Sequence, residues 1–260
     1  MPFHGEANRQ TMKVIASHDA GPVHLVTMQS TLPLALETLT RTVQVADGES
    51  VIDVISQLAS ALTVDRHISW AEHATIGPPF LEKGKVVVDM PATNCRVRPY
   101  KPGAIPGHLV YDKDFKWPMA HTNDGGQADI RVIPSDHNWL DLASCQMDTR
   151  RRLEFVTALH VEKHLVYGYG FRREDYSWLM SWMNFTGDDR AARGMEFSSQ
   201  PFDISHLLCA TPGLEDIWQD HYSAAGTKDT NPPDDTSPTW NPLTVGRRSS
   251  CPRNRTERSR

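Results

Sequence analysis

Short runs of β-branched and aliphatic residues recur along the first half of the chain, about every ten residues. They are MKVIAS (12–17), PVHLVTMQ (22–29), PLALETLTRTVQV (33–45), SVIDVISQLAS (50–60), KVVVDM (85–90) and DIRVIP (129–134). Gly, Pro, Asp or Asn borders most of these runs, which is typical of the alternating strands and turns of an all-β sandwich. The pattern therefore predicts six strands.

Two segments also fit a helical period. SVIDVISQLASAL is assigned to a strand only because it is rich in β-branched residues. In the segment 150–171, Leu153, Val156 and Leu159 suit a helix, whereas VTALHV and HLVYGYGF suit strands. We predict two strands there, and further strands in YSWLMSWMNF (176–185) and RGMEF, which are apolar and short.

The end of the chain differs in composition from the rest. Residues 223–260 are rich in Pro, Thr, Ser, Asp and Arg and contain few apolar residues that could be buried. We expect this tail to be disordered, whether it is natural or arises from a frameshift. Residues 1–222 are expected to form one domain.

Charge and hydropathy exclude two classes of partner. The formal net charge is −5, so the chain as a whole lacks the positive charge that drives binding to a phosphate backbone. No run approaches the ~18 apolar residues that a membrane-spanning helix needs, and the N-terminus has no apolar signal core. We expect neither nucleic acid nor membrane as a partner.

The four cysteines, Cys95, Cys145, Cys209 and Cys251, are far apart and form no C-x-x-C motif. Such usage indicates reduced thiols in a cytoplasmic protein.

Histidines are frequent, but none belongs to an H-E-x-x-H motif. The closest pair, His160 and His164, could hold zinc on a helix, where residues at i and i+4 share a face. Since this segment is predicted to form strands, we expect no metal site.

His73 lies in WAEHATIGPPF, where Trp70 and Phe80 can wall a pocket and Gly77 begins an irregular loop. A histidine on such a loop can be oriented for proton transfer near neutral pH. His4, in FHGEANR, has similarly small, turn-forming neighbours. The alternative for both is a structural histidine.

Glu196 lies in RGMEFSSQPF between Met195 and Phe197. Partial desolvation there would raise its affinity for a proton, which suits a general base. Pairing with Arg193 or Arg190 is the alternative.

Tryptophans are the candidate residues for stacking on a sugar ring. They are Trp178 and Trp182 in YSWLMSWMNF, together with Trp117, and the alternative for them is a place in the core.

Five motifs occur in order: FHGEA, WAEHATIGPPFL, WPMAHTNDGGQADIRVIP, YSWLMSWMNF and RGMEFSSQPFD. In this order they resemble the galactose mutarotase-like (aldose 1-epimerase-like) family, in particular a poorly characterised branch. The resemblance covers residues 3 to about 206. It implies an antiparallel β-supersandwich that binds a monosaccharide or another sugar-containing small molecule, without metal or organic cofactor.

The resemblance also implies roles for individual residues. In aldose 1-epimerases a glutamate takes the proton of the C1 hydroxyl while a histidine protonates the ring oxygen, and the ring opens. By motif position Glu196 is that base and His73 that acid, and His4 matches a histidine that binds the sugar. Trp70 and Trp178 are expected to contact the substrate.

The chain departs from the family at both ends. Family members carry further strands before the His-Gly motif and after RGMEF, so the resemblance implies a fold that is incomplete at both ends. A non-catalytic or degenerate carbohydrate-binding module is therefore the alternative function. A third possibility is other carbohydrate chemistry on the same fold, since a fold alone does not determine function.

Overall fold

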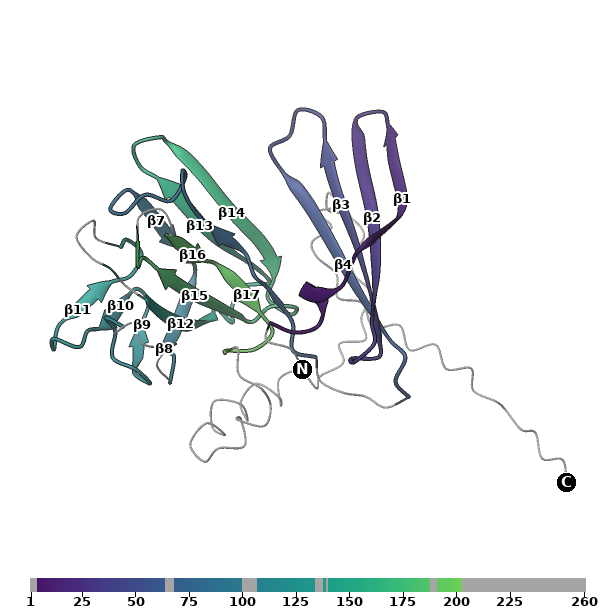
Figure 1. Cartoon of the computed structure of the whole chain (residues 1–260). Helices are drawn as coiled ribbons and strands as arrows, with labels where there is room; N and C mark the ends of the chain where they lie inside the picture. Colours follow the sequence, from purple (N-terminus) through teal and green to yellow (C-terminus); the bar gives the residue numbers. More distant parts are fainter. Residues whose placement is uncertain are drawn as a thin grey trace, which may run out of the picture. The chain divides into compact units, whose positions relative to one another are not determined.

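The computed structural model of the chain describes residues 4–63, 68–99, 107–133, 138, 140–187 and 191–202. This part consists of strands, apart from turns, loops and one short 3-10 helix, η1 (Ala7–Arg9) (Figure 1). The strand pairs are antiparallel wherever their register is defined. These features confirm the prediction of an all-β fold.

The described residues group into two compact units. One contains the residues up to Ile68 together with Gly170–Asp175, and the other contains Ser69–Tyr169 together with 176–202.

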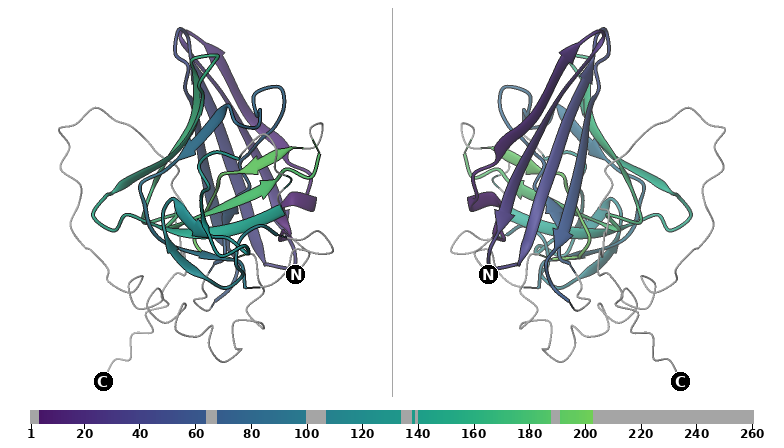
Figure 2. Two further views of the ribbon diagram at one scale, coloured as in Figure 1. Left: turned by 90° about the vertical axis from the view of Figure 1, so that its left-hand side faces the viewer. Right: turned by 90° about the vertical axis from the view of Figure 1, so that its right-hand side faces the viewer.

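The first unit is built on a four-stranded meander in the order β1-β2-β3-β4 (Figure 2). Its strands are β1 (Lys13–Ala20), β2 (Val23–Leu32), β3 (Glu37–Ala46) and β4 (Ile52–Ser60). The turns at Gly21 and Gly48 have φ of +71° and +77°, which glycine adopts without steric cost. The first four predicted runs are thus strands, and the helical alternative for 50–60 is wrong.

The second unit contains a ten-stranded sheet. Its main path runs β11-β10-β9-β8-β12-β15-β16-β6, while β17 pairs with β15 and β5 pairs with β17. The strands are β5 (Ala71–Glu72), β6 (Thr75–Ile76), β8 (Ala92–Val97), β9 (Asp114–Lys116), β10 (Met119–His121), β11 (Gln127–Asp129), β12 (Leu140–Met147), β15 (Trp178–Asn184), β16 (Ala192–Gly194) and β17 (Glu196–Ser198).

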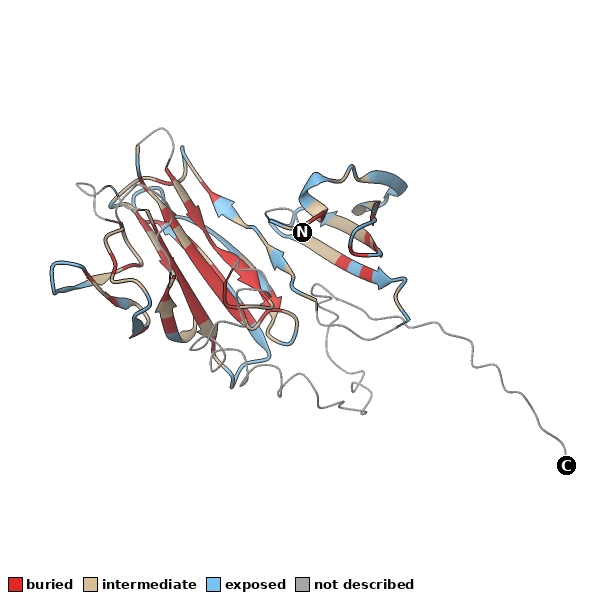
Figure 3. Ribbon diagram, turned by 60° about the horizontal axis from the view of Figure 1, so that its bottom comes forward, coloured by how far each residue is buried: buried red, intermediate tan, exposed pale blue. Residues whose placement is uncertain are grey.

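A smaller sheet in the order β14-β13-β7 belongs to this unit except for the end of β14, from Gly170 on. It consists of β7 (Val86–Asp89), β13 (Leu153–His160) and β14 (Leu165–Arg172), which confirms two strands within 150–171. Tyr169 on β14 contacts Phe197 on β17 with ring centroids 5.5 Å apart, so the two sheets face each other as a sandwich. Buried residues gather on the strands of the large sheet (Figure 3).

The predicted strand at 129–134 is largely wrong, because β11 ends at Asp129. The Asp129 carboxylate accepts a hydrogen bond from the backbone N–H of Arg131 at 3.0 Å and also binds the Arg131 guanidinium. An aspartate that bonds to the backbone two residues later closes a turn in place of continuing a strand.

Two central strands, β8 and β12, were not predicted. Polar residues interrupt both, but β12 buries Asp141 and Ser144 in the middle of the sheet. The Asp141 carboxylate accepts hydrogen bonds from the backbone N–H groups of His108 at 2.8 Å and Leu109 at 3.4 Å. Burial raises the pKa of this carboxyl group. The hydrogen bonds that allow this polar residue to be buried in a central strand thus come from a loop far away in the sequence. The local sequence pattern does not reveal them.

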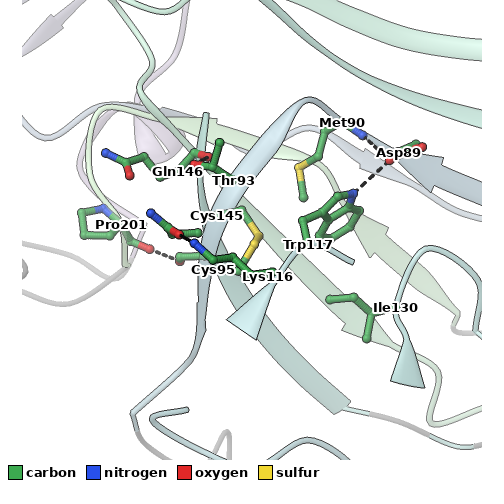
Figure 4. Close-up of a disulfide and its surroundings, with 12 residues drawn as sticks. Asp89, Met90, Thr93, Cys95, Lys116, Trp117, Ile130, Cys145, Gln146 and Pro201 are labelled. Atoms are coloured by element: carbon green, nitrogen blue, oxygen red, sulfur yellow. Dashed lines mark hydrogen bonds between the residues drawn. A yellow bond between two sulfur atoms is a disulfide. The ribbon is translucent and has the colours of Figure 1, made fainter. Parts of the chain in front are cut away.

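The prediction of reduced cysteines is wrong for Cys95 and Cys145, which form a disulfide (Figure 4). The antiparallel pairing of β8 with β12 places the two residues directly opposite each other. Fifty positions separate them in the sequence, so their spacing does not reveal the pairing. Cysteine usage therefore no longer supports a cytoplasmic location, which stays a prediction.

None of the helices in the described part of the chain is long and apolar enough to cross a membrane. The predicted tail at 223–260, its boundary at residue 222, Cys209 and Cys251 lie outside the described residues.

Candidate functional site

Two interrupted strands position the candidate acid and base. β16 and β17 are separated by Met195, and β5 and β6 by His73 and Ala74. β17 pairs with β5 and β16 with β6, so the two interruptions lie opposite each other. The Met195 backbone N–H donates to the Ala74 carbonyl at 2.8 Å and holds the interruptions together. His73 thus lies beside the start of β17, where Glu196 is the first residue.

The His73 and Glu196 side chains meet at this point. His73 Nε2 lies 3.5 Å from Glu196 Oε1, while 45% of the His73 side chain and 7% of the Glu196 side chain are exposed. The carboxylate is therefore almost enclosed by protein, whereas the imidazole is open to solvent. Such a pair can pass a proton between a buried oxygen and a ligand that arrives from solvent.

Gly194 makes room for the carboxylate. A Cβ atom at this position would lie 2.5 Å from Glu196 Oε1 and 2.9 Å from Trp182 Cβ. Both distances are shorter than non-bonded heavy atoms tolerate, so a side chain at 194 would displace Glu196 or the β15 backbone. The glycine is needed for close approach and not for a positive φ.

Thr75 holds the other nitrogen of the imidazole. Its Oγ1 lies 3.2 Å from His73 Nδ1 and donates to the His73 carbonyl at 3.4 Å. Because the hydroxyl proton is donated to the carbonyl, the hydroxyl oxygen is left to accept the Nδ1–H of His73. Nε2 is then the ring nitrogen that faces Glu196. The sequence motif contains Thr75, but the prediction gave it no role.

Trp182 is the aromatic residue beside the pair. Its ring lies edge-on to His73, with centroids 6.3 Å apart and an angle of 70° between planes. Residues 178, 180 and 182 of β15 point to one face, and Met180 is directly opposite Glu196. Trp182 is half-buried and Trp178, on the same face, is buried.

Trp70 is placed differently. Its Nε1 donates to Glu72 Oε1 at 3.1 Å, and Glu72 lies opposite Phe197 in the β5–β17 pair. Since Phe197 and Glu196 are adjacent in a strand, they point to opposite faces. The Trp70 indole is therefore directed to the Phe197 side of the sheet. Substrate contact by Trp70 and Trp178 stays a prediction.

His4, the remaining predicted contact, lies in a turn with φ of +63° and belongs to the other compact unit. Its role in sugar binding also stays a prediction.

Arg193 was one alternative partner for Glu196. Its side chain is buried, and its Nη2 donates to the Ile130 carbonyl at 2.8 Å. It pairs across the sheet with Met183, one strand position away from Gly194. The carboxylate of Glu196 therefore faces His73 and not Arg193. Arg190, the other alternative, lies outside the described residues.

His160 and His164 do not form a metal pair. His160 is fully buried at the end of β13, its Nδ1 accepts the backbone N–H of Lys163 at 3.3 Å, and its Nε2 lies 3.0 Å from Glu82 Oε1. His164 lies in the following turn with φ of +50°. Within the described ranges, no group of three or more His, Cys, Asp or Glu residues could hold a metal ion.

The described residues define an all-β sandwich. The chain is similar to the crystal structure of a candidate aldose 1-epimerase from Klebsiella pneumoniae subsp. pneumoniae, with a TM-score of 0.51 and 12% sequence identity. The similarity covers 74% of this chain and 46% of that protein, so the chain spans less than half of its neighbour's length. At this identity the similarity shows the fold alone.

No protein-family model matches the sequence, and no curated protein matches it.

Proposed function

We propose that this chain acts on sugars as an aldose 1-epimerase, interconverting anomers by acid–base ring opening. Glu196 is the base and His73 the acid. The observation that carries the proposal is the 3.5 Å separation of His73 Nε2 and Glu196 Oε1, which joins two motifs far apart in the sequence.

The proposed reaction begins with protonated His73 and ionised Glu196. Glu196 takes the proton of the C1 hydroxyl, Nε2 of His73 gives its proton to the ring oxygen, and the bond between C1 and the ring oxygen breaks. The open-chain aldehyde rotates about its C1–C2 bond. Closure reverses both transfers, so each residue returns to its first protonation state and no other reactant is consumed.

The separation of the two side chains suits this reaction. The C1 hydroxyl and the ring oxygen are bonded to the same carbon, so they lie closer together than two groups in hydrogen-bond contact. An acid and a base a few ångströms apart can therefore each reach one of these oxygens. General acid and base catalysis contribute about 10²- to 10⁴-fold each when the groups are so placed.

Burial of Glu196 beside an exposed imidazole supports the assignment of the two roles. A carboxylate with little access to water retains affinity for a proton, as a base requires. An exposed imidazole with Nδ1 held by Thr75 presents Nε2 to an incoming ligand.

The second candidate function is a carbohydrate-binding module without turnover. It is kept as an alternative because the similarity to the Klebsiella pneumoniae protein shows the fold alone. Under this proposal the Glu196 carboxylate accepts a hydrogen bond from a sugar hydroxyl group, and His73 Nε2 forms a second hydrogen bond to the sugar.

Saturation-transfer NMR of α-glucose and α-galactose tests both proposals on the full chain. Wild-type protein should exchange the anomeric protons faster than buffer, and Glu196→Gln and His73→Asn should each reduce the rate by at least about 10²-fold. Matched changes at exposed positions, Glu174→Gln and His18→Asn, should leave the rate unchanged.

A wild-type rate equal to that of buffer with both sugars would contradict the epimerase proposal. Quenching of tryptophan fluorescence by sugar without exchange would support the binding module. If the sugars cause no quenching and the protein does not speed up anomer exchange, both proposals are overturned.

A further inference from the structure

Trp182 is a half-buried aromatic residue of the candidate site. It lies on β15, between the residues that pair with β16 and those that pair with β17. Trp178 and Met180 are on the same face of this strand, but only 8% and 2% of them are exposed. Of these three side chains, Trp182 is therefore the one that reaches solvent.

Trp182 is close to both His73 and Glu196. Its ring centroid lies 6.3 Å from that of the His73 imidazole. A Cβ atom placed on Gly194 would lie 2.9 Å from Trp182 Cβ and 2.5 Å from Glu196 Oε1, so these two atoms are near each other as well. A ligand in hydrogen-bond contact with His73 Nε2 and Glu196 Oε1 is therefore within reach of the indole.

The indole N–H of Trp182 is an open hydrogen-bond donor. Within the described ranges it donates to no protein group, and it is not one of the buried polar atoms that lack a partner. Trp70 and Trp117, in contrast, donate their N–H groups to Glu72 at 3.1 Å and to Asp89 at 2.9 Å. A buried indole N–H usually finds a partner in the protein. The Trp182 N–H is accessible and stays available to a ligand.

A partly exposed indole with an open donor matches the two kinds of group on a pyranose. The ring of the sugar carries C–H groups that pack on an aromatic face, and its hydroxyl oxygens accept hydrogen bonds. An open-chain polyol offers the same hydroxyl groups but no rigid C–H face. The two properties of the indole together therefore favour a cyclic sugar.

We infer that Trp182 is a sugar-binding residue of the candidate site. Its indole packs on a pyranose ring, and its Nε1–H donates to a hydroxyl group of that ring. The inference rests on the proposed function, because it places the sugar at His73 and Glu196. It adds the substrate class, a pyranose and not an open-chain polyol, and a residue that selects for it.

Two-dimensional ¹H–¹⁵N NMR of the ¹⁵N-labelled full chain tests the donor directly. The indole signal that is missing from the spectrum of Trp182→Phe belongs to Trp182. Galactose and glucose should shift this signal in the wild-type protein until it saturates, whereas galactitol should leave it in place. The Trp117 signal, assigned in the same way from Trp117→Phe, should not move, because Asp89 already accepts its N–H.

The NMR outcomes separate this inference from the proposed reaction. A Trp182 signal that neither sugar moves would overturn the inference, even if the protein speeds up anomer exchange. A shifted signal without faster exchange would support the sugar contact and contradict the epimerase proposal. An equal shift with galactitol would overturn the pyranose as substrate class.

Steady-state kinetics of anomer exchange provide a second measurement. Trp182→Phe keeps an aromatic ring but removes the donor, so KM for galactose should rise about 2- to 10-fold with little change in kcat. Trp117→Phe is the matched control and should keep the wild-type KM, since that indole lies between β9 and β10 and is bonded to Asp89. Equal KM values for wild type and Trp182→Phe would contradict a hydrogen bond from Nε1.

Discussion

Two histidine–glutamate pairs in the second unit have opposite patterns of burial. In the first pair 45% of the His73 side chain and 7% of the Glu196 side chain are exposed. In the second, His160 is fully buried and 37% of the Glu82 side chain is exposed. Each pair consists of one histidine and one glutamate, with distances between His Nε2 and Glu Oε1 of 3.5 Å and 3.0 Å. The pairs therefore differ mainly in which partner is exposed to solvent.

This difference separates a pair suited to proton transfer from a structural one. Both ring nitrogens of His160 are bonded within the protein, Nδ1 to the Lys163 N–H and Nε2 to Glu82, and Glu82 also binds Lys163 and Lys85. A ligand has no access to that imidazole. The His73 imidazole, in contrast, is open to solvent beside the enclosed Glu196 carboxylate.

The largest expected effect comes from Gly194→Ala. The new Cβ would lie 2.5 Å from Glu196 Oε1, and the carboxylate, at the end of a side chain, can move away more easily than the Trp182 Cβ at 2.9 Å. A displacement of about 1 Å from reactive geometry costs roughly 10²-fold in rate. We expect anomer exchange, measured by saturation-transfer NMR, to fall by at least that factor while the fold is retained.

Gly77→Ala is the matched control, because a Cβ there would meet the Ala191 carbonyl at 3.5 Å, an ordinary contact. If Gly194→Ala exchanges anomers at the wild-type rate, the position of the Glu196 carboxylate does not matter to the reaction.

The order of sequence motifs selected His73 and Glu196 from all the histidines and acids of the chain, and the structure brings these two side chains together. The motif order gave no role to Gly194 and Thr75, because their contacts with Glu196 and His73 depend on how the chain bends at the gaps between β16 and β17 and between β5 and β6. Gly194 is needed because Glu196 folds back over it, and Thr75 holds His73 through a bond that depends on the gap between β5 and β6.

A similar limit applies to the fold. The meander β1 to β4 was predictable because turn residues separate apolar runs of even spacing. Strands β8 and β12 were not, because Asp141 is buried by bonds to a loop more than thirty positions earlier. The Cys95–Cys145 disulfide follows from the register of these same two strands and was missed for the same reason.

The second prediction concerns stability and compares the two histidines directly. His160→Asn should lower the free energy of unfolding by about 2–4 kcal/mol, because it removes two hydrogen bonds in a fully buried position. His73→Asn, at an exposed position, should change it by less than about 0.5 kcal/mol. Urea unfolding at pH 7, followed by tryptophan fluorescence, measures both. Equal losses would show that the two histidines have the same structural role.

The third prediction uses the pH dependence of the structural pair. Hydrogen bonds from Lys163, His160 and Lys85 lower the pKa of Glu82 from 4.5 to about 2 in the folded protein. A carboxyl group with a depressed folded pKa stabilises the protein above its unfolded pKa and loses that contribution as the pH falls through the folded value. The stability difference between wild type and Glu82→Gln should therefore be largest above pH 4.5 and vanish near pH 2. Unfolding curves at a series of pH values measure it, and a difference that does not vary with pH would contradict the assignment.

The smallest effect is expected at Thr75, which would act on the proposed reaction through its contact with His73. Thr75→Val removes the acceptor of the Nδ1–H, worth about 0.5–1.5 kcal/mol, so the neutral ring should populate both tautomers and exchange anomers roughly 2- to 10-fold more slowly. Thr75→Ser keeps the hydroxyl and should retain both the tautomer and the rate. The ¹⁵N shifts of the His73 ring report the tautomer without any sugar present, which separates the role of Thr75 from the question of activity. Identical ¹⁵N shifts in the Val and Ser variants would show that Thr75 does not select the tautomer, even if His73 and Glu196 catalyse ring opening.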